Sequence, residues 1–152
     1  MKTETAGITS RTEGLEGVVW SILGQTYVPK AMTDHSFAWH ATFPPGTFVP
    51  PHTHPTQNEY LYILEGRLDF WLNGVEAQAG PGDTVRLPMG EPHGIANKSD
   101  ANATVLFWVA PSGSLPTLFQ GLHDLPEQTP DAVVALAAEH EVFFLPPPEA
   151  LT

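Results

Sequence analysis

Cysteine is absent from this sequence, and that absence limits the chemistry the protein can perform. None of the 152 residues is cysteine. Disulfide bonds, thiolate metal ligands and thiol nucleophiles are therefore excluded together. Any metal ion held by this chain must be bound through nitrogen and oxygen atoms.

Basic residues are scarce as well. The chain has 6 Lys and Arg against 17 Asp and Glu, which gives a formal net charge of −11. A nucleic-acid or anionic membrane surface needs a basic face on its partner. We therefore expect no nucleic acid and no membrane as partners. The acidic excess is most simply a solubility feature.

Long apolar runs are also missing. No run approaches the roughly 18 consecutive apolar residues of a membrane-spanning helix. Residues 1–17 are polar and lack the apolar stretch of a secretory signal. From these two observations we expect a cytoplasmic location.

Proline and glycine, by contrast, are abundant. The chain has 16 prolines and 13 glycines, and 41% of its residues are hydrophobic. Many chain breakers between short apolar runs are typical of an all-β fold with tight turns. A chain of this length fits a single domain with a substantial core.

The apolar runs between these breakers are predicted to be strands. The predicted strands are residues 18–23, 35–43, 47–54, 59–64, 67–72, 75–79, 84–87, 93–97 and 102–110. Residues 1–16 are interpreted as a flexible N-terminal arm, and residues 25–33, which contain Pro29, as a connection.

Several local sequence features indicate how these predicted strands are arranged. Pro50 and Pro51 lie inside a predicted strand, which indicates an edge position or a bulge. Glu65-Gly66 and Asn73-Gly74 are each typical of a hairpin turn. Residues 102–110 are apolar on both faces, so the outer face of that strand needs a cover.

In the C-terminal part, the spacing of apolar residues changes from the alternation of a strand to the spacing of a helix. Leu115, Leu118, Phe119, Leu122 and Leu125 follow helical spacing. A second helix is predicted from Thr129 as N-cap and Pro130 as its first residue. We interpret both helices as a cover packed on the outer face of the sheet.

The residues with the clearest chemistry are two histidines one residue apart. On a strand, residues i and i+2 point to the same face, so His52 and His54 can converge on one point. A metal ion there needs ring nitrogens at about 2.0–2.2 Å. Glu59, which opens the next strand, can add an oxygen ligand, and His93 a fourth ligand from further along the chain.

Two spaced motifs in the chain resemble those of the cupin family. The first is Gly, five residues, His-x-His, three or four residues, Glu, six residues, Gly, and it is met by Gly46, His52, His54, Glu59 and Gly66. The second is Gly, five residues, Pro-x-Gly, two residues, His, three residues, Asn, and it is met by Gly82, Pro88, Gly90, His93 and Asn97.

The resemblance implies an all-β fold, the cupin double-stranded β-helix or jelly-roll barrel, with a short C-terminal helical extension. We place the barrel at residues 17–111 and the extension at residues 112–152. Asn97 is interpreted as a structural residue. His35, His40, His123 and His140 are interpreted as structural or exposed, and the tryptophans as core or interface residues.

The resemblance also implies one bound divalent transition metal ion, namely Fe, Mn, Ni, Co, Cu or Zn. Its ligands would be His52, His54, Glu59 and His93. A six-coordinate ion with four protein ligands keeps two positions for substrate oxygens or dioxygen. Glu59 is the candidate catalytic general base, because a carboxylate can leave the ion and accept a proton.

The same alternation predicts the wall of a substrate pocket. The residues expected to line a dry, apolar cavity are Phe48, Leu61, Ile63, Leu68, Phe70 and Ile95. Such a wall favours a flat, uncharged, aromatic or enolic substrate over a sugar phosphate.

Within the family, the chain looks like the one-domain cupins that resemble quercetin dioxygenase. The likeness depends on Pro45-Gly46, on Gln57-Asn-Glu59, and on the tail that ends at residues 143–146. It implies a metal-dependent dioxygenase that uses a small-molecule substrate and dioxygen, without an organic cofactor. The alternatives are a metal-dependent isomerase or lyase, and a non-catalytic ligand-binding cupin. We also expect a homodimer.

Overall fold

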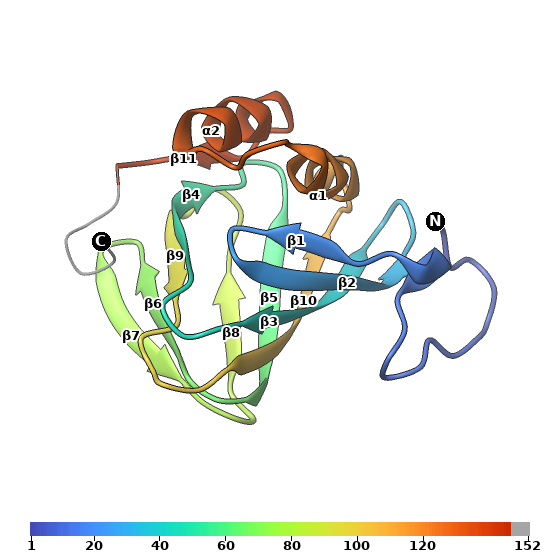
Figure 1. The fold of residues 1–152 in the computed structure, drawn as a ribbon, viewed down its shortest axis with the longest axis horizontal. Helices are drawn as coiled ribbons and strands as arrows, with labels where there is room; N and C mark the ends of the chain where they lie inside the picture. Colours follow the sequence, from blue (N-terminus) through green and yellow to red (C-terminus); the bar gives the residue numbers. More distant parts are fainter. Residues whose placement is uncertain (147–152) are drawn as a thin grey trace.

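Two antiparallel sheets enclose the core of the protein (Figure 1). The computed structural model describes residues 1–146. The six-stranded sheet consists, in spatial order, of β1 (Trp20–Ile22), β2 (Gln25–Met32), β3 (Phe37–Phe43), β10 (Ala103–Ala110), β5 (Asn58–Glu65) and β8 (Thr84–Leu87). The five-stranded sheet consists of β11 (Phe143–Phe144), β4 (Phe48–Thr53), β9 (His93–Ala96), β6 (Leu68–Leu72) and β7 (Val75–Ala79).

Alternation along the strands builds the core. In β3 the side chains of Phe37, Trp39, Ala41 and Phe43 are buried, and those between them are half-buried. The neighbouring strand β10 shows the same pattern, and Trp39 pairs with Phe107 across the two strands. The prediction of an all-β, two-sheet fold with C-terminal helices is therefore confirmed.

The interpretation of residues 25–33 as a connection is wrong, because most of them form β2. Pro29 is tolerated because the pairing of β2 with β3 shifts register between Pro29 and Ala31. Lys30 is the residue left without a partner on β3, and β1 pairs only as far as Tyr27, so Pro29 lies beside a bulge and beyond the pairing with β1, where a sheet tolerates proline.

Of the two predicted hairpins, only one forms. The Asn73-Gly74 turn joins β6 to β7, with positive φ at both residues. At Glu65-Gly66 the prediction is wrong, because β5 and β6 belong to different sheets and the chain crosses between them. Gly66 has φ +79°, and a Cβ on it would lie 2.6 Å from the carbonyl oxygen of Asn102.

The strand with two prolines contains the predicted bulge. The pairing of β4 with β9 shifts register between Val49 and His52. The strand is not at an edge, because β11 pairs along its other side and the N–H of Leu145 donates to the carbonyl of Pro51 at 2.8 Å.

The two helices, α1 (Leu115–Asp124) and α2 (Pro130–Glu139), lie together at one end of the sheets (Figure 1). The predicted cap is confirmed: the Thr129 hydroxyl accepts a hydrogen bond from the N–H of Ala132. Packing on the outer face of the sheet is not observed. Phe119 of α1 instead contacts Trp20 and Trp39, whose side chains face the core, at ring distances of 5.6 and 5.0 Å. The apolar helix faces therefore close the open end between the sheets.

The N-terminal residues follow β2. The N–H of Thr3 donates to the carbonyl of Met32 at 2.7 Å, and the Lys30 ammonium donates to three backbone carbonyls of the arm. A single 3₁₀ turn, η1 (Leu15–Gly17), leads into β1. The flexibility of the arm stays a prediction. Within residues 1–146, no helix is long and apolar enough to cross a membrane.

Candidate metal centre

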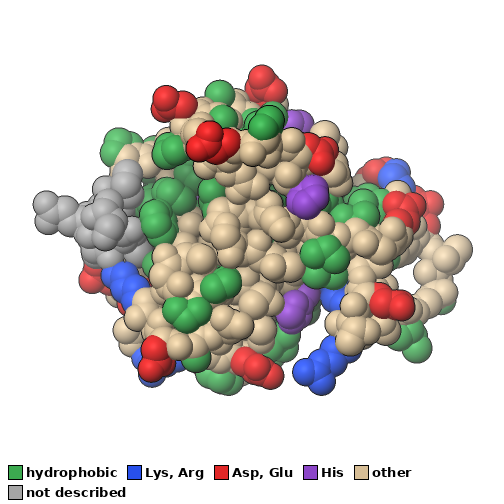
Figure 2. Space-filling view, in the orientation of Figure 1, with side chains coloured by type: hydrophobic (Ala, Val, Ile, Leu, Met, Phe, Trp, Pro, Cys, Tyr) green, Lys and Arg blue, Asp and Glu red, His purple; other side chains and the backbone are tan. Residues whose placement is uncertain are grey.

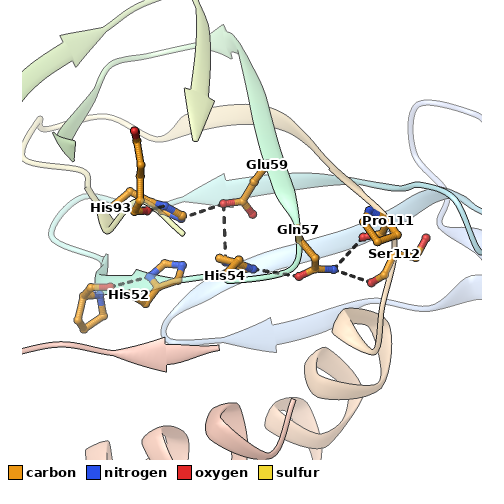
Figure 3. A network of polar contacts seen from close by, with 9 residues as sticks. His52, His54, Gln57, Glu59, His93, Pro111 and Ser112 are labelled. Atoms are coloured by element: carbon orange, nitrogen blue, oxygen red, sulfur yellow. Dashed lines mark hydrogen bonds and ion pairs between the residues drawn. The ribbon is translucent and has the colours of Figure 1, made fainter. Parts of the chain in front are cut away.

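The four predicted ligands meet between the two sheets. Ligand atoms of His52, His54, Glu59 and His93 all lie within 4.8 Å of one another, and all four residues are buried (Figure 3). His52 of β4 and His93 of β9 are cross-strand partners, with ring centroids 4.4 Å apart. His54 follows β4, and Glu59 reaches the group from β5 in the opposite sheet. The structure thus brings together side chains that are up to 41 residues apart, from position 52 to position 93.

Hydrogen bonds at Nδ1 orient the three imidazole rings. Nδ1 of His52 contacts the carbonyl of Pro50 at 2.8 Å, and Nδ1 of His93 contacts that of Glu91 at 3.2 Å. A carbonyl oxygen can only accept, so each Nδ1 carries the proton. In the neutral ring this leaves the lone pair on Nε2, which is the arrangement of a metal-binding histidine.

The third ring is oriented by Gln57, which the sequence analysis did not identify as a site residue. The Gln57 amide donates from Nε2 to the carbonyls of Pro111 and Ser112, at 3.0 and 2.8 Å (Figure 3). Its Oε1 is therefore the atom that faces His54 Nδ1, at 3.0 Å, and it accepts that proton. The signal in the sequence was its position two residues before Glu59.

Burial sets the charge of the imidazoles. Desolvation, followed by the neighbouring His93 and His54, holds the pKa of His52 well below its ordinary value of 6.5. His52 is therefore neutral at pH 7 and can donate a lone pair.

Glu59 experiences opposing effects. Burial is the largest single influence and raises the pKa of this carboxyl, but His54 and His93 together outweigh it and the net pKa is lowered from 4.5. Glu59 is therefore a carboxylate at pH 7. Three imidazoles and one carboxylate form a nitrogen- and oxygen-rich donor set that suits a divalent transition ion.

Two ligand nitrogens lack hydrogen-bond partners, which tests whether the site fits a metal. Nε2 of His54 and of His93 are buried and make no hydrogen bond, although each lies within ion-pair distance of Oε2 of Glu59, at 3.9 and 3.0 Å. An unpaired buried polar atom costs about 1–3 kcal/mol, so native proteins rarely keep one. A cation among these atoms would use both lone pairs, and the residues therefore fit a bound metal ion.

A small apolar cavity adjoins this centre. Its volume is about 60 Å³, and His52, His54 and Glu59 form one side of it. Trp39 and Phe107 contribute from the six-stranded sheet, and both helices and β11 contribute apolar side chains. A water molecule needs roughly 10–15 Å³ of such space, so the cavity holds a few waters rather than a whole substrate.

The predicted pocket wall differs from this cavity. Of the six residues expected to line it, Ile95 does so. Leu61, Ile63, Leu68 and Phe70 are buried in the core away from it, and Phe48 is 38% exposed and lines a separate groove. Alternation shows which side chains of a strand face the interior, but not which of them line the cavity and which are packed in the core. One part of the inner face is filled by its own packing, and the cavity forms where the helices approach.

The remaining polar residues have structural contacts. Asn97 donates from Nδ2 to the carbonyls of Phe43 and Ala101, at 2.7 and 2.8 Å, as expected of a structural residue. His123 Nδ1 accepts the N–H of Ser21, and His140 contacts the hydroxyl of Ser114.

Comparison with known proteins agrees with this geometry. Residues 39–109 match the family model described as "Cupin domain". "Tetracenomycin polyketide synthase protein TcmJ" of Streptomyces glaucescens is 33% identical over 82 residues, which cover 54% of this chain and 55% of that protein. "Quercetin 2,3-dioxygenase" of Bacillus subtilis is 31% identical over 81 residues, which cover 53% of this chain but 23% of that protein.

Among solved structures, KdgF from Halomonas sp. is similar with a TM-score of 0.64 and 21% identity, over 70% of this chain and 94% of that one. At this identity the likeness concerns the fold alone. The chain spans only about half the length of the polyketide synthase protein and less than a quarter of the length of the quercetin dioxygenase.

Proposed function

Because residues 39–109 match the cupin-domain family model, we propose that this chain is a mononuclear metal-dependent dioxygenase acting on a small aromatic or enolisable substrate. The observation that carries this proposal is the convergence of three histidines and one glutamate at the side of an apolar cavity. We also propose a cytoplasmic location and a homodimeric assembly.

A bound divalent ion of Fe, Mn, Ni, Co, Cu or Zn supplies Lewis acidity toward substrate oxygen atoms. The protein's own part is to hold three imidazoles with Nε2 directed inward and to keep Glu59 ionised. As a carboxylate, Glu59 can accept the proton of a substrate hydroxyl or enol at Oε2, the atom that lies 3.0 Å from His93.

The cavity wall supports an uncharged substrate. Among the described residues that line it, no lysine or arginine is present. A sugar phosphate or another anion would meet no cationic side chain there, whereas the uncharged end of an aromatic or diketone-like molecule would meet an apolar wall. Tyr27 adds no charge, because burial, and then the Glu59 carboxylate, raise the pKa of its phenol.

The relatives with similar sequences support the same substrate class. One relative is a quercetin dioxygenase, and another is a polyketide synthase protein. Flavonols and polyketides share carbonyl groups that enolise and that present paired oxygen atoms. The shared chemistry is thus an enolisable, oxygen-bearing end on an apolar body.

Oxygen uptake tests the proposal. Purified protein is loaded with each of the six metals in turn and mixed with quercetin or with acetylacetone, a compact β-diketone. We expect uptake with at least one metal, and its loss in the metal-free protein and in Glu59→Gln. An absence of uptake with every metal and both substrates would contradict the dioxygenase.

A metal-dependent isomerase or lyase is the second candidate. The similarity to "Dimethylsulfoniopropionate lyase DddQ" of Ruegeria pomeroyi, 30% identical over 87 residues, favours it. Substrate turnover in the absence of dioxygen would select this candidate. Metal-dependent binding of a ligand without any turnover would select a non-catalytic cupin.

A further inference from the structure

A second hollow lies against the metal-centre cavity. We call it the outer groove; its volume is about 490 Å³. Phe48 and Pro50 of β4, Val134 of α2, and Leu145 are among the residues that line it. Leu23, Val133 and Phe144 line both the outer groove and the metal-centre cavity, so these side chains form a shared wall.

The outer groove has the size and chemistry of a small-molecule site. Ligand pockets typically measure about 300–1,000 Å³ and are mostly apolar, and the outer groove falls in this range while the metal-centre cavity does not. None of the described residues that line it is charged. The amide of Gln128, one of its polar groups, is already engaged: Oε1 accepts the N–H of Leu23, and Nε2 donates to two carbonyls.

Apolar side chains of the outer groove reach the surface. Phe48 is 38% exposed and Val134 is 44% exposed. Hydrophobic side chains are visible at the surface below α2 and over β4 (Figure 2). Clustered exposed apolar groups in a concave site are typical of ligand binding.

Phe144 of the shared wall contacts one of the four candidate ligands. Its ring contacts that of His52 at a centroid distance of 5.3 Å, and the two residues are strand partners. It belongs to β11, a strand of two residues at the edge of its sheet. A short edge strand has few backbone hydrogen bonds and opens more readily than the strands within the sheet.

We propose that the outer groove is a binding subsite for the flat apolar body of a ligand whose oxygen-bearing end lies at the metal centre. Phe144 separates the two compartments. The identity of the oxygen-bearing end depends on the function proposed above, whereas the affinity of the groove for an apolar body does not. The shared wall and the absence of charge favour this occupant over a peptide or a second copy of the chain.

Flavone, which lacks the 3-hydroxyl group of a flavonol, is the probe for the subsite alone. Its binding to the metal-free protein is measured by titration of methyl signals in NMR spectra. We expect signals of Val134 and Leu145 to shift, and Val134→Asp to weaken binding at least tenfold. Val75→Asp, which alters an exposed valine on β7 outside the groove, is the control and leaves binding unchanged.

Kinetics extend the test to the loaded protein. For Val134→Asp and for Phe144→Ala, kcat/KM is measured with quercetin and with compact acetylacetone. We expect Val134→Asp to lower the quercetin-to-acetylacetone ratio of kcat/KM at least tenfold. Phe144→Ala removes the dividing ring and is expected to raise this ratio.

The outcomes separate the two proposals. Flavone binding that depends on Val134, without oxygen uptake by any loaded protein, leaves the subsite standing and rejects the dioxygenase. Oxygen uptake with equal flavone affinity in Val134→Asp and Val75→Asp overturns the subsite and leaves the dioxygenase standing. A change of oligomeric state in Val134→Asp with unchanged flavone affinity also overturns it, because the occupant is then a second copy.

Discussion

Gln57 orients a residue of the candidate metal centre without being one of the four candidate ligands. Its amide is fixed by two backbone carbonyls, and this leaves Oε1 to accept the Nδ1 proton of His54. The chain thereby selects the tautomer that directs Nε2 of His54 toward Glu59 and His93.

Replacing Gln57 by leucine is therefore expected to weaken metal binding about 10–100-fold, the usual effect of removing such a partner. The His54 ring loses both its orientation and its preferred tautomer. Apparent affinity is measured by competition with a chelator. Gln78→Leu, at an exposed glutamine on β7, is the control and binds metal as the parent protein does. Equal affinity in both variants would show that Gln57 does not orient the ring.

Acid is expected to destabilise the metal-free protein. The pKa of His52 is lowered in the folded state from an ordinary value of 6.5, chiefly by burial. Below pH 6.5, His52 binds a proton in the unfolded chain but not in the folded one. The free energy of unfolding therefore decreases as the pH falls from 6.5 toward the lowered pKa of the folded state. Glu59, whose pKa is lowered from 4.5, adds a further loss below that value.

Free energies of unfolding at pH 7.5 and pH 5.5, from denaturant titrations, test this expectation. The fall between the two values is expected to shrink in His52→Gln and to persist in His35→Gln, at an exposed histidine. His40→Gln is expected to reduce this fall in stability as well, but by less than His52→Gln does. The pKa of half-buried His40 is also lowered, by burial and then by Lys30 and Arg11. A parent protein equally stable at both pH values would contradict the argument.

At the scale of elements, the crossing between β5 and β6 depends on one glycine. A Cβ at Gly66 would lie 2.6 Å from the carbonyl oxygen of Asn102 and 2.8 Å from Cα of Ala103, and both are backbone atoms that cannot rotate away. Gly66 also has a left-handed φ of +79°. Gly74 in the β6–β7 hairpin has a similar φ of +90°, but nothing lies within 4 Å of its Cβ position.

Gly66→Ala is therefore expected to cost about 3 kcal/mol or more of stability, from the backbone conformation and the steric clash together. Gly74→Ala carries the conformational cost alone, about 1–2 kcal/mol. Denaturant unfolding of both variants measures the difference. Equal losses would mean that the crossing adjusts to accept a side chain.

The edge strand β1 shows how the helices are attached to the sheet. The backbone N–H of Ser21 in β1 donates to His123 of α1, and that of Leu23, just after β1, donates to Gln128 in the α1–α2 connection. The indole N–H of Trp20 donates to Gln120 at 2.9 Å. These contacts satisfy an exposed sheet edge and hold the helices across the open end, where they complete the cavity.

At the scale of the whole molecule, the outer face of the six-stranded sheet is uncovered within the described residues. Tyr60 and Trp108 stack there with ring centroids 5.5 Å apart, and neighbouring Tyr62 and Leu64 are 40% and 43% exposed. Aromatic and aliphatic side chains on a sheet face are typical of a protein interface. This face is our proposed dimer interface.

Light scattering after size exclusion tests the dimer. We expect the parent protein to be a dimer at micromolar concentration. Tyr62→Lys is expected to shift it toward monomer, because the dimer interface would then bury one lysine from each subunit. Val75→Lys, on the edge hairpin, is expected to remain a dimer. A parent protein that is strictly monomeric would reject the assembly.

The sequence by itself determined the ligand set and the faces of the strands. His52, His54, Glu59 and His93 were predicted as ligands from the two motifs that resemble those of the cupin family, and the inward side chains of β3 from alternation. Alternation is a local feature, because side-chain direction along a strand depends on neighbouring residues.

Only the tertiary structure decided which strands join which sheet, where the helices lie and which residues line the cavity. The crossing at Gly66 depends on Asn102, and the position of α1 depends on the contact between Phe119 and Trp39. The role of Gln57 depends on carbonyls more than 50 residues away along the chain. The physical reason is that these contacts join residues far apart in sequence, so no local pattern of apolar and polar residues contains them.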